Sequence, residues 1–246
     1  AEAVAVAKEA DYVIFIGGLN KSAHQDCEDA DRKELGLSYG QDKVITALVK
    51  ANKNLIVVNI SGNAIAMPWV KEVPAIVQAW YLGSEAGSAI ASVLTGDVNP
   101  SGKLPFTFPA SLQDAHKLGE YPGTPRSDGS PIVDQKYNEG IFVGYRWVDK
   151  EKTKPLFSFG HGLSYTTFAY GKAVADKKVM GQDEMLTITL PVTNTGSREG
   201  SEVIQLYISD LKSSLPRPVK ELKGFSKVKL APGETREVTF TIGKEA

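Results

Sequence analysis

The sequence predicts an α/β domain with a mostly parallel sheet and helices on both faces, followed by an all-β sandwich. In the first half, apolar runs typical of buried strands alternate with amphipathic helical segments, and this order favours parallel strands covered by helices. Residues 110–131 are rich in Gly, Pro, Ser and Asp, which indicates a long surface connection. Beyond about residue 171, short strands recur between turn residues, as they do in a small β-sandwich.

Apolar spacing places the elements of the first half in order. Residues 1–10 are predicted to form a helix, and the run DYVIFI at 11–16 predicts a buried strand. Residues 41–51 have their apolar side chains on one face of a helix. The remaining elements are strands at 55–60, 75–80 and 104–109, the last bounded by prolines, and a helix from 84 to about 94.

Turn residues divide the second half. The segments NTG at 194–196 and APGE at 231–234 separate apolar runs that alternate with polar residues. Strands are predicted at 186–192, 202–209, 220–230 and 236–242. We therefore assign residues 1–117 to the α/β domain, 118–168 to a linker and connecting loops, and 169–246 to the β-sandwich.

Composition excludes several classes of partner. The 246 residues, 42% hydrophobic and 23% charged, are ordinary for a globular protein with a core. A net charge of −1 provides no basic field for a phosphate backbone, so we expect no nucleic acid partner. The longest apolar runs are far too short to cross a bilayer, so we expect no membrane partner. An upstream targeting segment stays open, and a periplasmic or secreted location is favoured over the cytoplasm.

The residues that bind metals and nucleotides are sparse. Cys27 is the single cysteine, which excludes an internal disulfide and a cysteine-based metal site. Gly17-Gly18 follows a predicted strand, but no third glycine opens a helix as dinucleotide binding would require. The histidines have no ligand spacing; they are His24, His116 and His161. We therefore predict no metal and no cofactor.

The most informative local feature is the carboxylate cluster CEDADR at 27–32. It lies downstream of the strand predicted at 11–16, and loops at the carboxyl ends of strands in open α/β sheets are where ligands bind. This position makes Glu28 a candidate functional acid. A solvated loop acid paired with Arg32 is an equally consistent interpretation, because charge runs are commonly exposed faces.

Three other polar residues have simpler structural explanations. Ser38 lies in a G-x-S-x-G pattern, but charged residues precede it where a serine nucleophile needs a buried strand. Glu85 is at a helix start, where exposed N–H groups favour a carboxylate. His161 lies in an aromatic and glycine-rich turn, which is typical of a packed histidine.

Several motifs, taken together and in order, resemble the C-terminal part of family 3 glycoside hydrolases, the β-glucosidase and β-xylosidase group. The resemblance covers almost the whole chain. The motifs are EDADR at 28–32, WYLGSEAG at 80–87, GDVNPSGKLP at 96–105, YNEGIFVGYR at 137–146, FGHGLSY at 159–165, VTNTG at 192–196 and KELKGF at 220–225. Asp29 stands where the family usually has glycine, and Leu82 and Ala86 replace a common proline and glycine.

The resemblance implies a retaining β-glycosidase built from an N-terminal barrel, an α/β sandwich domain and a fibronectin type III-like domain. It implies that Glu28 is the general acid/base, that Asp31 and Arg32 support its loop, and that the aspartate nucleophile lies on the barrel. The barrel and an oligosaccharide or β-glycoside substrate are then the expected partners. No barrel is recognisable in this chain and both domains resemble incomplete ones, so we expect an isolated fragment without hydrolytic activity.

Two alternatives remain open. The chain could be a non-catalytic carbohydrate-binding or structural module, with aromatic residues such as Trp80, Tyr81, Tyr145 and Trp147 stacking on sugar rings. A serine hydrolase that uses Ser38 is the other alternative. If Glu28 is only a loop acid, Glu85 and Glu139 are the next candidates for the acid/base.

Overall fold

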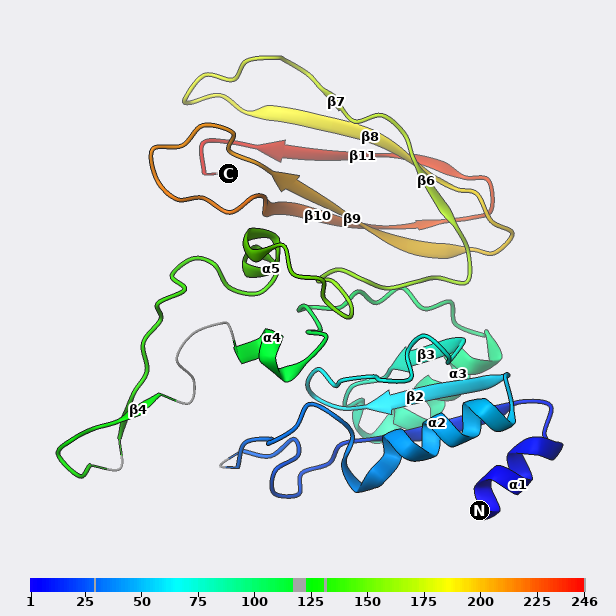
Figure 1. Cartoon of the computed structure of the whole chain (residues 1–246). Coiled ribbons are helices and arrows are strands. Elements are labelled where there is room, and N and C mark those ends of the chain that lie inside the picture. The colour runs from blue at the N-terminus through cyan, green and yellow to red at the C-terminus, as the bar shows by residue number, and fades with distance from the viewer. Residues whose placement is uncertain (29, 117–122, 131, 246) are drawn as a thin grey trace. The chain divides into compact units, whose positions relative to one another are not determined.

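The computed structural model describes residues 1–28, 30–116, 123–130 and 132–245 (Figure 1). These residues form two units whose segments interleave along the sequence. The first unit combines Ala1–Ala91 with Phe108–Leu118 and Lys154–Phe157, and the second combines Ser92–Thr107, Gly119–Thr153 and Ser158–Ala246. No helix among the described residues has the length and apolar character needed to cross a membrane.

A three-stranded parallel sheet is the centre of the first unit. Its order is β1 (Val13–Gly18), β2 (Leu55–Ile60) and β3 (Ala75–Gln78), with Val13 opposite Leu55 and Ile56 opposite Ala75. The helices of this region are α1 (Glu2–Glu9), α2 (Gln41–Ala51), α3 (Ala86–Thr95), α4 (Leu112–His116) and the 3₁₀ helices η1 (Ser38–Gly40) and η2 (Gly83–Glu85). The α/β class predicted for the first half is confirmed.

The core of the first unit lies between α2 and the central strand. Spacing of three and four residues places Ile45, Leu48 and Val49 on one helix face, and all three are buried. On β2, Leu55 and Val57 are also buried. A strand with a parallel neighbour on each side contributes side chains to both faces, so its near-continuous apolar sequence is expected.

The prediction of a buried strand at 11–16 was wrong in one respect, because β1 is partly exposed. It lies at the edge of the sheet, and Ile14 and Ile16 on one face are 49% and 56% exposed. A continuous apolar run does not distinguish an edge strand from a central one. The strand also extends to Gly18, where φ is +146° and a Cβ atom would lie 1.8 Å from the Ile60 carbonyl oxygen. Glycine is therefore required where β1 ends against β2.

The strand predicted at 104–109 was wrong. This segment bends at residues 105–106 and forms isolated pairs: the Leu104 N–H donates to the His161 carbonyl, and the Phe108 N–H donates to the Phe157 carbonyl, both at 2.8 Å. Pro105 and Pro109 have no N–H to donate, so a continuous ladder cannot form.

The second unit contains the β-sandwich, which confirms the class predicted for the second half. One antiparallel sheet pairs β9 (Gly200–Ile208) with β10 (Glu221–Leu230). The other has the order β11 (Thr235–Ile242), β8 (Leu186–Asn194), β6 (Phe168–Tyr170), with β7 (Val174–Ala175) also on β8. The core between them is Val192, Ile204, Val228, Leu230, Val238 and Phe240. The unit also holds α5 (Tyr145–Glu151) and the short pair β4 (Thr124–Pro125) and β5 (Val133–Asp134).

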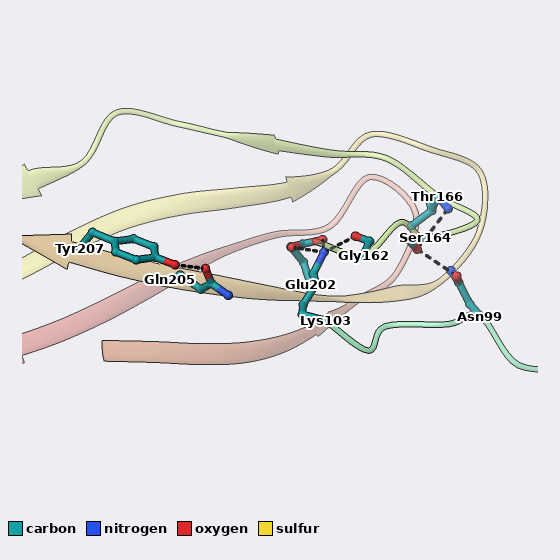
Figure 2. A network of polar contacts seen from close by, with 8 residues as sticks. All are labelled: Asn99, Lys103, Gly162, Ser164, Thr166, Glu202, Gln205 and Tyr207. Atoms are coloured by element: carbon teal, nitrogen blue, oxygen red, sulfur yellow. Dashed lines mark hydrogen bonds and ion pairs between the residues drawn. The ribbon is translucent and has the colours of Figure 1, made fainter. Parts of the chain in front are cut away.

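A polar network ties two loop segments to β9 (Figure 2). The Lys103 Nζ atom donates to the Gly162 carbonyl at 2.6 Å and pairs with a Glu202 carboxylate oxygen at 3.0 Å. Asn99 Oδ1 accepts from the Ser164 hydroxyl at 2.9 Å. The side chains of Lys103 and Glu202 are only 16% and 11% exposed, so each charge depends on the other for compensation.

We predict that Lys103→Met lowers the free energy of unfolding by about 3 kcal/mol, because it leaves the Glu202 charge buried without its cation. The double variant Lys103→Met/Glu202→Leu should recover most of the loss. Urea denaturation of the protein measures both. The matched control is Lys229→Met, which removes the exposed Lys229–Glu199 pair and should change the value by less than about 1 kcal/mol. Equal losses for the two lysine variants would contradict the prediction.

Candidate active site

The candidate site is the loop of residues 19–37, which joins β1 to η1 and α2 in the first unit. The first residue of α2, Gln41, closes this loop onto the strand. Its side-chain amide donates to the Gly18 carbonyl at 2.8 Å and to the Ser38 carbonyl at 3.1 Å, and it accepts from the Gly18 N–H at 2.9 Å. The loop therefore leaves and re-enters the fold at the carboxyl end of β1, where ligands bind in parallel sheets.

Arg32 fixes the second half of the loop. Its guanidinium donates to the Ala64 carbonyl at 2.8 Å and to the Leu35 carbonyl at 2.7 Å. Burial lowers the pKa of Arg32, and the charge of Asp26 opposes that shift. A planar group that donates two directed bonds suits this place, where a lysine would offer a single charged point.

Asp26 fixes the first half of the loop. Its Oδ2 atom accepts from the Gly62 N–H at 2.6 Å and from the Tyr81 hydroxyl at 2.9 Å. Burial, followed by the hydrogen bond and the charge of Asp26, raises the pKa of Tyr81 to about 12. Gly62 follows β2 and Tyr81 follows β3, so a single carboxylate oxygen joins the loop to the ends of both neighbouring strands.

Glu28 lies between these two anchors and is exposed. Its backbone carbonyl accepts from the Ala30 N–H at 2.8 Å. Over the described part of the chain, its carboxylate forms no hydrogen bond and no ion pair, and Arg32 bonds to backbone carbonyls instead. Asp29, which stands where the family usually has glycine, lies outside the described residues. The Asp31 carbonyl is 3.0 Å from His24 Nδ1, which adds a contact within the loop.

The other predicted candidates are in different settings. Ser38 begins η1, as a helix-entry residue would. Glu85 ends η2 and accepts from the Ser88 hydroxyl at 3.2 Å. In the second unit, burial and the charge of Lys103 lower the pKa of His161. Also in that unit, the Glu139 Oε2 atom is buried and has no hydrogen-bond partner among the described residues.

Two of the four aromatic residues named as candidates for sugar binding, Trp80 and Tyr145, pack against other rings. Trp80 contacts Phe108 edge to face, with ring centroids 6.1 Å apart. In the second unit, Tyr145 stacks on Phe159 at 5.2 Å and also meets Tyr207 edge to face. Tyr81 is 48% exposed, and Trp147, in the second unit, has the Lys150 Nζ atom 5.3 Å from its ring centroid. Ring packing therefore makes Trp80 and Tyr145 weaker candidates for a sugar-binding platform.

Comparison with known proteins identifies the family. Residues 1–165 match the glycosyl hydrolase family 3 C-terminal domain, and residues 202–246 match a fibronectin type III-like domain. The chain belongs to glycoside hydrolase family 3.

Among the residues that the structure describes, no group of three or more acidic, histidine or cysteine side chains could hold a metal ion.

Similar proteins are β-glucosidases in several organisms. The chain is 53% identical to the β-glucosidase BoGH3A of Bacteroides ovatus, a match that covers 100% of this chain and 32% of that protein. It is 40% identical to the thermostable β-glucosidase B of Acetivibrio thermocellus, covering 100% of this chain and 31% of that protein. The chain thus spans about a third of the length of these curated family 3 relatives.

Solved structures support the same family. The crystal structure of a β-glucosidase from Kluyveromyces marxianus in complex with glucose superimposes with a TM-score of 0.85 and 40% sequence identity. The match covers 98% of this chain and 28% of that one. A β-glucosidase from Bifidobacterium adolescentis superimposes with a TM-score of 0.86 and 36% identity, over 99% of this chain and 35% of that one.

The hydrogen bond between Tyr81 and Asp26 was not predicted from the sequence, where Tyr81 was considered only as an aromatic residue that could stack on sugar. Its partner Asp26 is 55 positions away. No local pattern connects an acid in one loop with a tyrosine after another strand. The available signal was positional: both residues follow predicted strands of a parallel sheet, whose carboxyl ends share one edge.

We predict that Asp26→Asn lowers the pKa of Tyr81 from about 12 part of the way to the ordinary value of 10.0, because it removes the negative charge but not the burial. Since burial and then the contact with Asp26 raise the folded-state pKa, the contribution of Tyr81 to stability is full below pH 10 and is lost as the pH rises toward 12. Carbon-13 NMR of labelled tyrosine rings gives the midpoint, with Tyr81→Phe to assign the signal. An unchanged midpoint in Asp26→Asn would contradict the prediction.

Proposed function

We propose that the protein to which this chain belongs is a retaining β-glycosidase of the β-glucosidase type, and that Glu28 is its general acid/base. One observation carries the proposal: the Glu28 carboxylate is exposed and unpaired among the described residues, on a loop anchored on either side at the carboxyl edge of a parallel sheet. Glu34 on the same loop is also exposed, and Glu28 is distinguished from it by its place in the EDADR segment that resembles the family motif. The β-glucosidase relatives support the substrate class, which is a terminal β-linked sugar of an oligosaccharide or glycoside.

The proposed reaction has two steps. An aspartate on a barrel domain of the same protein attacks the anomeric carbon, the bond to the leaving oxygen breaks, and the Glu28 carboxyl proton passes to that oxygen. Water then attacks the glycosyl-enzyme, giving its proton to the Glu28 carboxylate and its oxygen to the sugar, and the aspartate is released. The two carboxyl groups would lie about 5 to 5.5 Å apart in such an enzyme.

Asp31 and Arg32 support the loop in this proposal. Arg32 does so through the Ala64 and Leu35 carbonyls. A chain that supplies the acid/base without the nucleophile is expected to be inactive by itself. The family resemblance implies that the sugar pocket lies mostly on the barrel, so the residues of this chain do not decide between glucose and xylose.

The test is Glu28→Ala in the full-length protein, with aryl β-glucosides as substrates. We expect kcat/KM to fall about 10² to 10⁴-fold on a substrate with a poor leaving group, because no proton reaches the departing oxygen. On an activated substrate, glycosylation is spared but water attack stalls. Azide, which needs no general base, should restore turnover and give the β-glycosyl azide.

Glu34→Ala is the matched control, since Glu34 is another exposed glutamate of the same loop. It should behave as the parent does. If Glu28→Ala also behaves as the parent, Glu28 is only a loop acid, and the same experiment passes to Glu85 and Glu139.

A further inference from the structure

We propose that Asp26 and Tyr81 are positioning residues for Glu28: their hydrogen bond holds the loop so that the Glu28 carboxyl reaches the leaving oxygen. This inference rests on the proposed function, because it assigns a role to two residues through the acid/base. It concerns only the first unit, which contains all of the residues involved.

The contact is built from three strand ends. Asp26 is two residues before Glu28, and its Oδ2 atom accepts from the Gly62 N–H at 2.6 Å and the Tyr81 hydroxyl at 2.9 Å. Both bonds involve a charged acceptor, which makes them stronger than neutral hydrogen bonds. Asp26, two residues before the proposed acid/base, is thus tied to the segments that follow β2 and β3.

The surroundings of Tyr81 are arranged for this contact. Its ring lies against Gly62, where a Cβ atom would come within 2.9 Å of the Tyr81 Cε2 atom. The preceding residue, Trp80, has a φ of +59°, which is uncommon for a bulky side chain. Contact between the Trp80 and Phe108 rings accompanies this strained turn. A strained backbone persists only where its surroundings determine it, and here the turn leads directly into Tyr81.

The start of the loop is fixed by further bonds. Gln25 is buried, donates to the Tyr39 hydroxyl at 2.8 Å and accepts from the Asn20 N–H at 3.2 Å. The Asp26 N–H donates to the Asn20 carbonyl at 3.0 Å. Glu28 itself has an exposed side chain without a partner in the described residues, so its position depends on the backbone that carries it. A displacement of about 1 Å of a reacting group can reduce a rate by about 10²-fold.

The variant Tyr81→Phe distinguishes an effect of loop position from an effect of the Asp26 charge. Tyr81→Phe removes only the hydroxyl: the ring still covers Gly62 and the negative charge of Asp26 remains two residues from Glu28. An effect of this variant on proton donation therefore comes from the position of the loop. Asp26→Asn, a second variant, keeps an acceptor for the Gly62 N–H while weakening the bond to Tyr81.

The experiment measures kcat/KM in the full-length protein for aryl β-glucosides with leaving groups of graded basicity. We expect Tyr81→Phe to reduce the value about 10-fold or more for a poor leaving group such as phenol, and less than about 3-fold for 2,4-dinitrophenol. In a Glu28→Ala background, which has no acid to position, Tyr81→Phe should cause no further leaving-group dependence. Tyr207→Phe is the matched control, because it removes a hydroxyl that bonds Gln205 Oε1 at 2.7 Å in the second unit.

The possible outcomes are distinct. Equal losses on both substrates, or a further steepening in the Glu28→Ala background, would overturn the positioning role and indicate a general structural one. A lowered melting temperature of Tyr81→Phe with no leaving-group dependence would do the same. If Glu28→Ala itself shows no leaving-group dependence, the proposed function fails and this inference fails with it. If kcat/KM of Glu28→Ala depends strongly on the leaving group and that of Tyr81→Phe does not, only the positioning role of Asp26 and Tyr81 fails.

Discussion

Parallel pairing of β1, β2 and β3 is the constraint on which the candidate site depends. Because the strands run in one direction, Gly18, Ile60 and Gln78 end at the same edge of the sheet. The segments after these strands hold Glu28 and its supports. An antiparallel neighbour would have delivered its loop to the opposite edge. The apolar core beneath α2 therefore has a chemical consequence, since it fixes the register that brings these strand ends together.

Polar side chains hold the irregular backbone at this edge, together with the buried Leu19 and Leu37 at the two ends of the loop. Asp26 and Arg32 each join the loop to a segment far away in the sequence, and Gln41 closes its base. A typical hydrogen bond adds about 1 kcal/mol to stability, and one with a charged partner about 1.5 to 3 kcal/mol. A few such bonds can define the position of a loop without burying its acid. Burial of Glu28 by apolar packing would instead have closed it off from a substrate.

Prediction from the sequence succeeded where local spacing determines structure. The helix at 41–51 and the strand at 55–60 were predicted with the bounds that the structure has, because the apolar residues of the helix recur on one face and those of the strand form one short continuous run. It failed at 104–109, where the alternating pattern was correct but two prolines prevent a ladder. It could not find the Asp26–Tyr81 contact, since a pairing across 55 positions is set by the tertiary fold. For Glu28, position after a strand indicated only a candidate acid, and the proposed role as acid/base rests on the resemblance of its motif to the family.

The proposed division of the catalytic groups between two domains would make two demands on geometry. The distance between acid and nucleophile in a retaining glycosidase is about 5 Å, so both carboxyl groups must be placed to a fraction of that length. Within the first unit, hydrogen bonds to the ends of β2 and β3 and to the Ala64 and Leu35 carbonyls meet the local demand. The second demand, the distance between the two carboxyl groups, would have to be met by the docking of the two domains. A loop that is rigid on its own sheet needs only one correct domain arrangement, whereas a loose loop would have to be ordered again at each substrate encounter.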